Sequence, residues 1–306
     1  MGRLRRLEDL GLAQERQTGV WQIADDIEPK LKSLGSRGDI IKTMHCALRE
    51  AKIDRPAGSF AVFDTSKPNN RIVGRVAGIG LTDEISDRHY LVVDGVDGKV
   101  HYADVGHLVP EHVPEKGMIV SIENRANGEV EQVRTRLRIL SYLGLSNLTE
   151  AEGATWLDKE LLSQKPEWLV EQGFGTNVKS ALLKRRQWLV SEELGAFGAE
   201  LEFRAVPGLL AQLQERNLSQ ASNTLSQELG LKPMRLVADE QISGIYLRPV
   251  TLSSGKFAII QKSKEFTLVP WQAEMEKNRD KMVSGTVKAN GISWEWDFKR
   301  KGLGIS

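Results

Sequence analysis

The chain has 306 residues, 40% of them hydrophobic and 27% charged, which is enough for two or more packed domains. Its formal net charge of +1 excludes a large overall positive charge, so any nucleic-acid surface must come from local clusters of lysine and arginine. The single cysteine excludes a disulfide framework and fits a reducing compartment. No run of about 18 apolar residues and no signal-peptide pattern occurs, so we expect a cytoplasmic protein without a membrane partner.

Residues 1–55 predict a winged-helix-like module. Leucines three residues apart over residues 4–10 indicate a short helix, which a glycine ends. An alternating segment at residues 15–23, broken by a glycine, is typical of a two-stranded wing. Apolar residues at helical spacing then predict two more helices, over residues 27–34 and 39–51, separated by a pair of glycines.

Residues 56–136 change to short alternating or β-branched segments, punctuated by glycine, asparagine, aspartate and proline. About five strands at this spacing predict a small antiparallel β-barrel, for which an oligonucleotide-binding (OB) barrel is one candidate. An Asp-Gly turn at residues 94–99 supports one of its hairpins.

Residues 137–233 return to helical spacing. Thr149, with Glu152 three residues later, predicts a helix N-cap. An amphipathic helix is expected around Lys184, Arg185 and Arg186, with these three residues on its solvent side, and a further helix precedes residue 230.

Residues 234–306 predict a β-rich C-terminal domain of hairpins, with turns at residues 254–255 and 290–291. The expected fold class is therefore α+β, in four parts: residues 1–55, 56–136, 137–233 and 234–306. No internal repeat is evident in the sequence.

The sequence offers few groups for catalysis. Four of the five histidines, His89, His101, His107 and His112, lie close together, but their spacing does not match a metal-binding motif. Neighbouring strands bringing His89 and His101 together would be needed for a metal site. Carboxylates between residues 83 and 97 fit turns better than acid–base catalysis, because aspartate bonds nearby backbone amides. We therefore predict no catalytic residue, no metal and no cofactor.

Clusters of basic residues are more informative, because each can neutralise phosphates. Arginines lead the first helix and alternate along a segment near residue 136, and compact basic runs occur near residues 185 and 300. Solvated faces balanced by nearby acids are the alternative for each cluster. The predicted DNA-binding residues are Arg3, Arg5, Arg6, Arg16, Arg134, Arg136, Lys184, Arg185, Arg186, Lys299, Arg300 and Lys301.

Longer segments carry a family resemblance: LRRLEDLGLA, LKSLGSRGDIIKTMHCAL, RHYLVVDGVDGKVHYADVG, GATWLDKELLSQ, SGIYLRPVTLSSGKFAII, EFTLVPW and KRKGLGI. In this order, over residues 3–305, the chain resembles the C-terminal region of VirD2-like conjugative relaxases, the mobilisation nucleases of plasmids and integrative elements. In that family the region follows the nuclease domain and has no assigned function.

The resemblance implies that the nuclease lies elsewhere. A relaxase nicks one DNA strand with a tyrosine, using a metal held by a histidine cluster. Here no His-hydrophobic-His motif occurs and the first tyrosine is Tyr90, so no catalytic residue is carried over. The stretch before GATWLD is shorter than in the family pattern, so we expect a shortened version of the region. Met1 and Gly2 are then either an added start on a fragment or part of a remnant reading frame.

Three functional hypotheses follow. The first is a non-catalytic relaxase region that binds DNA or relaxosome partners during transfer. The alternative is a protein-interaction module recognised by type IV secretion coupling proteins, with the basic tail at residues 299–306 as a signal. The third, an independent metal-dependent enzyme, would require the histidines between residues 89 and 112 to converge.

Overall fold

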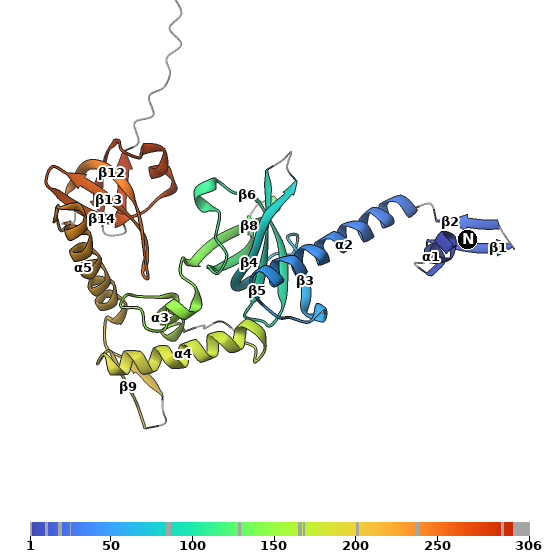
Figure 1. The fold of residues 1–306 in the computed structure, drawn as a ribbon, viewed down its shortest axis with the longest axis horizontal. Helices are drawn as coiled ribbons and strands as arrows, with labels where there is room; N and C mark the ends of the chain where they lie inside the picture. The colour runs from blue at the N-terminus through green and yellow to red at the C-terminus, as the bar shows by residue number, and fades with distance from the viewer. Residues whose placement is uncertain are drawn as a thin grey trace, which may run out of the picture.

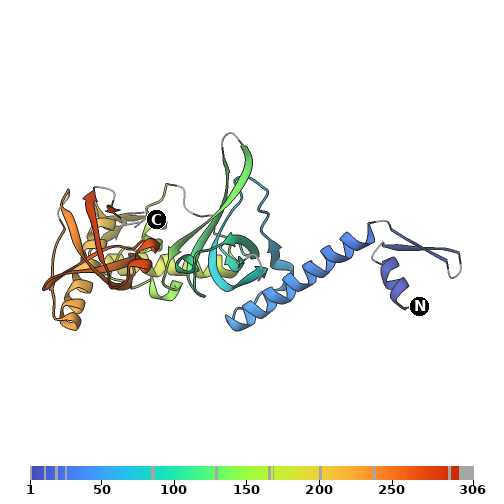
Figure 2. The same ribbon diagram turned by 90° about the horizontal axis from the view of Figure 1, so that it is seen from above.

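The structure is a computed structural model, and it describes residues 2–9, 12–17, 20–24, 26–83, 87–127, 130–164, 167, 169–199, 202–236, 239–288 and 291–295. Within these residues the chain is α+β, as predicted, with two six-stranded mixed sheets and helices that pack on them. Figures 1 and 2 show an elongated molecule, with an N-terminal hairpin at one end, the first sheet in the middle and the second sheet at the other end.

The N-terminal part confirms the predicted order of helix, turn and hairpin but not the two helices after it. α1 (Gly2–Asp9) leads into β1 (Ala13–Gln17) and β2 (Val20–Ile23), and a single 24-residue helix, α2 (Ile27–Glu50), follows. Pro29 is tolerated in the first turn of α2, where backbone N–H groups have no intrahelical partner. A glycine inside a helix costs only about 1 kcal/mol, so the two glycines do not end α2.

The predicted winged-helix core is therefore not formed by the described residues. Such a core needs helices packed around the hairpin, but α2 leads away from it. Figures 1 and 2 both place α1 and the hairpin at the far end of α2, away from the sheets.

The first sheet is mixed and open. Its strands are β3 (Phe60–Val62), β4 (Arg71–Asp83), β5 (Arg88–Gly95), β6 (Val100–His107), β7 (Ile119–Asn127) and β8 (Val130–Ser141). They lie in the order β3-β6-β5-β4-β7-β8, with β3 parallel to β6 and the other pairs antiparallel. The barrel predicted for residues 56–136 is wrong, because the sheet does not close. To close a barrel of β4–β8, the free edge of β6 would have to pair with β8. That edge is already paired with β3.

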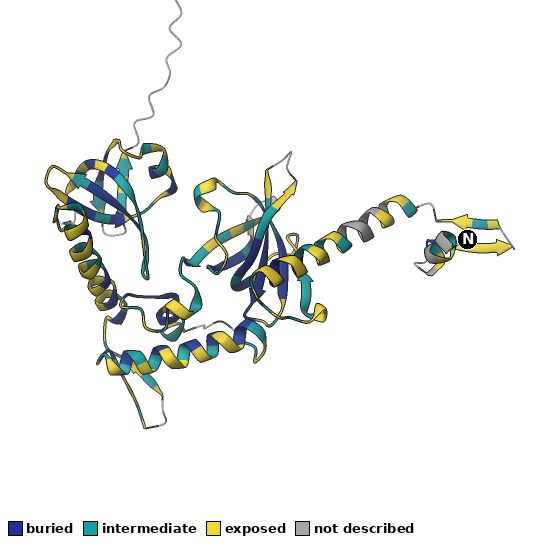
Figure 3. Cartoon of the chain, in the orientation of Figure 1, coloured by how far each residue is buried: buried dark blue, intermediate teal, exposed yellow. Residues whose placement is uncertain are grey.

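The two faces of this sheet are buried by different partners. One face encloses an apolar cluster that includes Val76 and Leu91. α2 covers part of the other face, where Met44 packs with Val92 and Tyr102. Figure 3 shows buried residues gathered in the strands, whereas the N-terminal hairpin is mostly exposed. The C-terminal half of α2, which contains Met44, therefore packs on the first sheet and not on the hairpin.

The middle of the chain is helical, as predicted. It contains α3 (Trp156–Leu161), α4 (Gly173–Ser191), the hairpin of β9 (Gly195–Phe197) and β10 (Phe203–Ala205), and α5 (Leu209–Leu229). Among the described residues, no helix is long and apolar enough to cross a membrane.

A capping box starts α3. The Thr155 hydroxyl accepts a hydrogen bond from the Asp158 N–H at 3.3 Å, and the Asp158 carboxylate accepts one from the Thr155 N–H at 2.7 Å. The cap predicted at Thr149 is wrong, because Thr149 lies in a turn and its hydroxyl donates to the Ser146 carbonyl.

The second sheet is also mixed and open. Its strands are β11 (Lys232–Pro233), β12 (Gln241–Leu252), β13 (Gly255–Lys262), β14 (Glu265–Pro270), β15 (Met282–Lys288) and β16 (Gly291–Glu295). They lie in the order β11-β14-β13-β12-β15-β16. α5 covers one face of this sheet, where Leu225 packs on Ile259 and Phe266. Tyr246 lies in a separate apolar cluster, together with Ile260. The turn predicted at residues 254–255 is confirmed, and residue 290 lies outside the described residues.

The two sheets share one topology. Numbered along the chain, the strands of each lie in the spatial order 1-4-3-2-5-6, with strand 1 parallel to strand 4. In each, a long helix precedes strand 1, and a 3₁₀ helix follows strand 4: η2 (Pro110–His112) and η4 (Ala273–Asn278). We call α2 with β3–β8 the N-terminal unit, and α5 with β11–β16 the C-terminal unit. The described chain therefore contains one kind of fold unit twice.

Backbone hydrogen bonds extend this match to single residues. The carbonyl of Val76 in β4 accepts from the Gly117 N–H at 2.8 Å, and the carbonyl of Tyr246 in β12 accepts from the Asp280 N–H at 2.8 Å. Both acceptors lie on the second strand of their unit, and both donors stand just before the fifth strand. The two units therefore have the same pairing register at this point.

Each unit also has a glycine two residues before this position, Gly74 and Gly244. A Cβ added to Gly74 would lie 2.3 Å from the carbonyl oxygen of Asp94, and one added to Gly244 would lie 2.4 Å from that of Gln261. Both glycines therefore permit a close approach of the second strand to the third, which a side chain would block.

Candidate nucleic-acid interface

One side of strands β4, β7 and β8 carries a group of arginines, which we call the arginine face. All of its members are exposed. They are Arg71, Arg125, Arg134, Arg136 and Arg138.

Strand register brings these residues together. Arg71 in β4 is the cross-strand partner of Glu123 in β7, and Glu123 is the partner of Arg136 in β8. Because side chains alternate along a strand, the neighbouring Ile122 and Leu137 point to the opposite side, into the apolar cluster of the sheet. A buried face therefore fixes which side the arginines take.

Among the described residues, carboxylates pair with only some members of the arginine face. Glu123 is shared by two arginines, with its oxygens 3.2 Å from Arg125 Nε and 3.4 Å from an Arg138 terminal nitrogen. Arg134 and Arg136 form no ion pair with any described residue. Both side chains are exposed, which suits contact with an anion from solution.

Arg71, at the edge of this face, is held more firmly. It pairs with Glu167 and also donates to the Ser121 hydroxyl at 3.3 Å. Burial raises the pKa of the Glu167 carboxyl above its usual value, although the positive charge of Arg71 opposes that shift. Arg71 is therefore less free to turn toward a ligand than Arg134 or Arg136.

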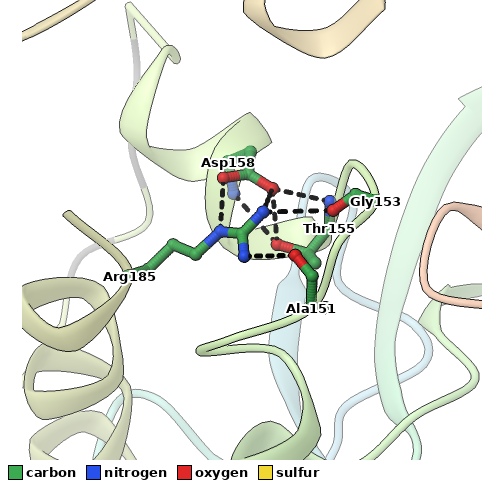
Figure 4. A network of polar contacts seen from close by, with 5 residues as sticks. All are labelled: Ala151, Gly153, Thr155, Asp158 and Arg185. Carbon is green, nitrogen blue, oxygen red and sulfur yellow. Dashed lines mark hydrogen bonds and ion pairs between the residues drawn. The ribbon is translucent and has the colours of Figure 1, made fainter. Parts of the chain in front are cut away.

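The basic run on α4 is divided by the helix. Lys184 is exposed and Arg186 is half-buried, but Arg185 is fully buried. Arg185 forms a bidentate ion pair with Asp158, in which its Nε lies 2.8 Å from one carboxylate oxygen and a terminal nitrogen lies 3.0 Å from the other (Figure 4). The prediction that Arg185 binds DNA is wrong, because its guanidinium lies inside the protein.

Arg185 instead joins three segments of the chain. Besides Asp158 of α3, it donates to the carbonyls of Ala151 at 2.6 Å and Gly153 at 3.1 Å (Figure 4). Its guanidinium carbon also lies 4.3 Å from the centre of the Trp188 ring. Every charged hydrogen-bonding group of this buried pair thus has a partner, which is the condition under which burial of charge is tolerated.

The other predicted residues lie apart from the arginine face. Arg5 and Arg16 are exposed in the N-terminal helix and hairpin, and Arg16 donates to the Gln22 side chain at 2.7 Å. Outside the described residues lie the side chains of Arg3 and Arg6, and all of Lys299, Arg300 and Lys301.

The histidines do not gather around a common point. His101 shares a hydrogen bond of 2.9 Å with Asp97, whereas His112 lies edge-on to the ring of Trp271. The part of the chain that the structure describes contains no group of three or more histidine, cysteine or carboxylate side chains placed to hold a metal ion.

On strands β5 and β6, α2 covers Val92 and Tyr102. This part of the first sheet is therefore closed to a nucleic acid, whereas the arginine face is exposed.

The sequence placed Arg134, Arg136 and Arg138 on one face of a strand as a possible phosphate-binding patch, although only Arg134 and Arg136 were predicted as DNA-binding residues, and it gave no role to Arg71 and Arg125. The Arg-x-Arg-x-Arg pattern already indicated that Arg138 shares their side of a strand. Arg71 and Arg125 carry no such signal, because they join the face only when β4 and β7 pair.

A comparison with protein families finds a match over both halves of the chain. The family model described as "Protein of unknown function (DUF3363)" matches residues 1–134 and 127–304, which together cover nearly the whole chain. No curated protein and no solved structure matches the chain.

Proposed function

The chain belongs to the DUF3363 family, and from its surfaces we propose that it is a non-catalytic, DNA-binding region of a conjugative relaxase. In this proposal it acts in the cytoplasm and holds the transferred DNA, or relaxosome partners, while a nuclease domain cuts. The link to relaxases rests on the resemblance of the segments quoted above. The DNA-binding role rests on the arginine face.

The arginine face supports contact with the phosphate backbone and not with bases. Guanidinium groups bind phosphate oxygens through two parallel hydrogen bonds, which a strand can present at regular spacing. Arg134 and Arg136 are the two members without an ion pair among the described residues, so binding costs them no existing partner. Backbone contacts of this kind position DNA without reading its sequence.

The proposal is tested by the salt dependence of binding. We expect the double variant Arg134→Gln with Arg136→Gln to bind DNA more weakly and to lower the slope of log K against log salt. The slope should fall by about 1.8 for duplex DNA or about 1.4 for a single strand, since each phosphate contact contributes about 0.9 or 0.7. Fluorescence anisotropy with a labelled oligonucleotide measures both quantities.

A matched control removes the same charge elsewhere. Arg204 and Arg235 are also exposed arginines, but they lie in β10 and before β12, away from the arginine face. Arg204→Gln with Arg235→Gln should leave the slope unchanged. Equal losses in both double variants would show that only net charge matters, and unchanged binding in the Arg134 and Arg136 variant would reject this interface.

A second candidate, a protein-interaction module of the secretion pathway, is supported by a different surface. Because the first sheet does not close, β3 is an edge strand, and an apolar groove of about 390 Å³ lies between it and α2. Ile41 and Val62 line this groove and are 46% and 58% exposed. A partner segment could add to such an edge as a further strand.

Val62→Lys separates the two candidates. A lysine on an edge strand opposes strand addition, so this variant should lower DNA transfer between cells and leave DNA affinity unchanged. Transfer at the wild-type frequency would remove the support that the groove gives to the second candidate.

A further inference from the structure

A pocket of about 400 Å³ with several polar side chains in its lining lies between α4 and the first sheet, apart from the arginine face. One wall is a stripe of α4 in which Asn177, Ser180 and Lys184 follow one another at helical spacing. The opposite side is formed by Arg75 of β4 and by the loop that contains Ser146. Among the described residues that line the pocket there is no carboxylate.

The charge balance beside this pocket is positive. Arg55 and Arg75 both bind Asp94, whose side chain is fully buried. Arg55 takes both carboxylate oxygens at 3.0 Å, and a terminal nitrogen of Arg75 shares one of them at 2.8 Å. One carboxylate can compensate only one of the two guanidinium groups. One positive charge therefore remains unbalanced in a partly buried place, where electrostatic interactions are stronger than in water.

Arg75 is also held in position before any ligand arrives. Its guanidinium carbon lies 5.1 Å from the centre of the Phe174 ring, and Asp94 fixes its end. The side chain is 26% exposed, and its Nε has no hydrogen-bond partner in the structure. Lys184, on the other wall, is exposed and forms no ion pair with a described residue. A fixed cation thus faces a second, exposed cation across a pocket whose lining includes hydroxyl and amide groups.

We propose that this pocket binds the phosphate group of a phosphorylated ligand. A phosphate dianion would balance the extra charge of Arg75 and pair with Lys184, and its oxygens would accept hydrogen bonds from Ser180 and Asn177. The pocket is within the size range of small-molecule sites, roughly 300–1,000 Å³. The same chemistry is offered by a free mononucleotide and by the 5′-phosphate at the end of a nucleic acid.

The position of the pocket favours neither source alone. Arg75 and Arg71 project from the same side of β4, and four residues of strand span about 13 Å. A strand of DNA on the arginine face could therefore end in the pocket. The site itself rests on Arg75 and Lys184 and not on the DNA-binding role proposed above.

Titration of the full chain with inorganic phosphate tests the site without DNA. We expect saturable shifts of the amide resonances of Asn177 and Ser180, and a rise of the melting temperature with ligand concentration. Lys184→Gln should weaken phosphate binding about tenfold, the loss typical of a charged hydrogen bond. Ser180→Asp should abolish it, because it places a carboxylate in the pocket. Both positions are exposed, so both variants are expected to fold.

Lys179→Gln is the matched control, since Lys179 lies on the same helix but pairs with Glu171 outside the pocket. It should bind phosphate like the wild type, as should Arg134→Gln with Arg136→Gln. Comparison of a mononucleotide with 5′-phosphorylated and unphosphorylated oligonucleotides identifies the source. Tighter binding of the phosphorylated oligonucleotide alone indicates a nucleic-acid end, and equal binding of the mononucleotide indicates a free ligand. No saturable shift with any phosphate probe, or an unchanged affinity in Lys184→Gln, overturns the proposal.

Discussion

At the scale of single residues, adjacent basic residues in the sequence do not necessarily form one basic surface in the structure. Lys184, Arg185 and Arg186 are adjacent in sequence, but a helix turns each by about 100° from the last, so they cannot share one environment. Arg185 continues a buried stripe of α4 that includes Val178, Ala181 and Leu189. That spacing was visible in the sequence, but the positive charge pointed to solvent. Its partner Asp158, on α3, was not identifiable without the fold.

Loss of either partner of this buried pair should destabilise the protein strongly. We expect Arg185→Met, or Asp158→Asn, to lower the free energy of unfolding by about 3–5 kcal/mol, because each leaves an unpaired buried polar group or charge. Urea unfolding followed by circular dichroism measures the change.

Two comparisons make this prediction specific. Lys184→Ala, at the exposed neighbour, should change stability by less than about 0.5 kcal/mol. Arg185→Met combined with Asp158→Leu should recover part of the loss, since a buried ion pair can be replaced by apolar side chains of similar volume. A single variant as stable as the wild type would show that Arg185 does not hold α3, α4 and the residue 151–155 segment together.

At the scale of elements, the sequence predicted where strands lie but not how they pair. Alternation identified most strands of both sheets because it reports one buried and one exposed face, but β11 and the end of β8 lay in the segment that was predicted to be helical. Whether the first sheet closes into a barrel depended instead on β3, a three-residue strand that pairs with the edge of β6. A pairing between segments some 40 residues apart leaves no local pattern. For the same reason Arg134 and Arg136 were found from one strand, whereas the rest of the arginine face needed the register of β4 with β7.

The glycines of α2 show a different kind of error. A local signal for a helix end was present in the sequence, but the helix continues through it. Gly38 was predicted to separate two helices but lies inside one, and nothing lies within 4 Å of a Cβ built on it. Gly38→Ala should therefore stabilise the first half of α2 by about 0.5–1 kcal/mol, by lowering the conformational entropy of the unfolded chain.

Amide hydrogen exchange measures this effect locally. Protection of residues 37–42 should rise about two- to five-fold in Gly38→Ala, whereas the docked residues 44–48, which pack on the sheet, should change little. If exchange in Gly38→Ala is not slowed at any residue, or is faster in the first half of α2, the helix is interrupted at this glycine in solution.

At the scale of the whole molecule, the main unpredicted feature is the repeated unit. The two units agree in strand order and hydrogen bonding, but equivalent core positions hold different side chains, such as Val76 and Tyr246. The repeat is therefore not visible as a repeat of residues. The units also touch through equivalent elements: His112 of η2 lies 6.4 Å from the ring of Trp271, which leads into η4. Lys256 lies 3.6 Å over the same ring, and burial lowers the pKa of its ammonium group although Glu276 opposes this shift.

If the units are equivalent, the same substitution should damage each in the same way. Gly74→Ala and Gly244→Ala each place a methyl group less than about 3 Å from a carbonyl oxygen of the third strand, and such overpacking costs about 1–3 kcal/mol. We expect Gly74→Ala to reduce hydrogen-exchange protection of β5 and Gly244→Ala to reduce that of β13, by similar factors. Gly58→Ala is the control, because nothing lies within 4 Å of its added Cβ. Loss of protection in both sheets from either substitution would show that the two units unfold as one, and a neutral effect at either glycine would show that the match between them stops short of this position.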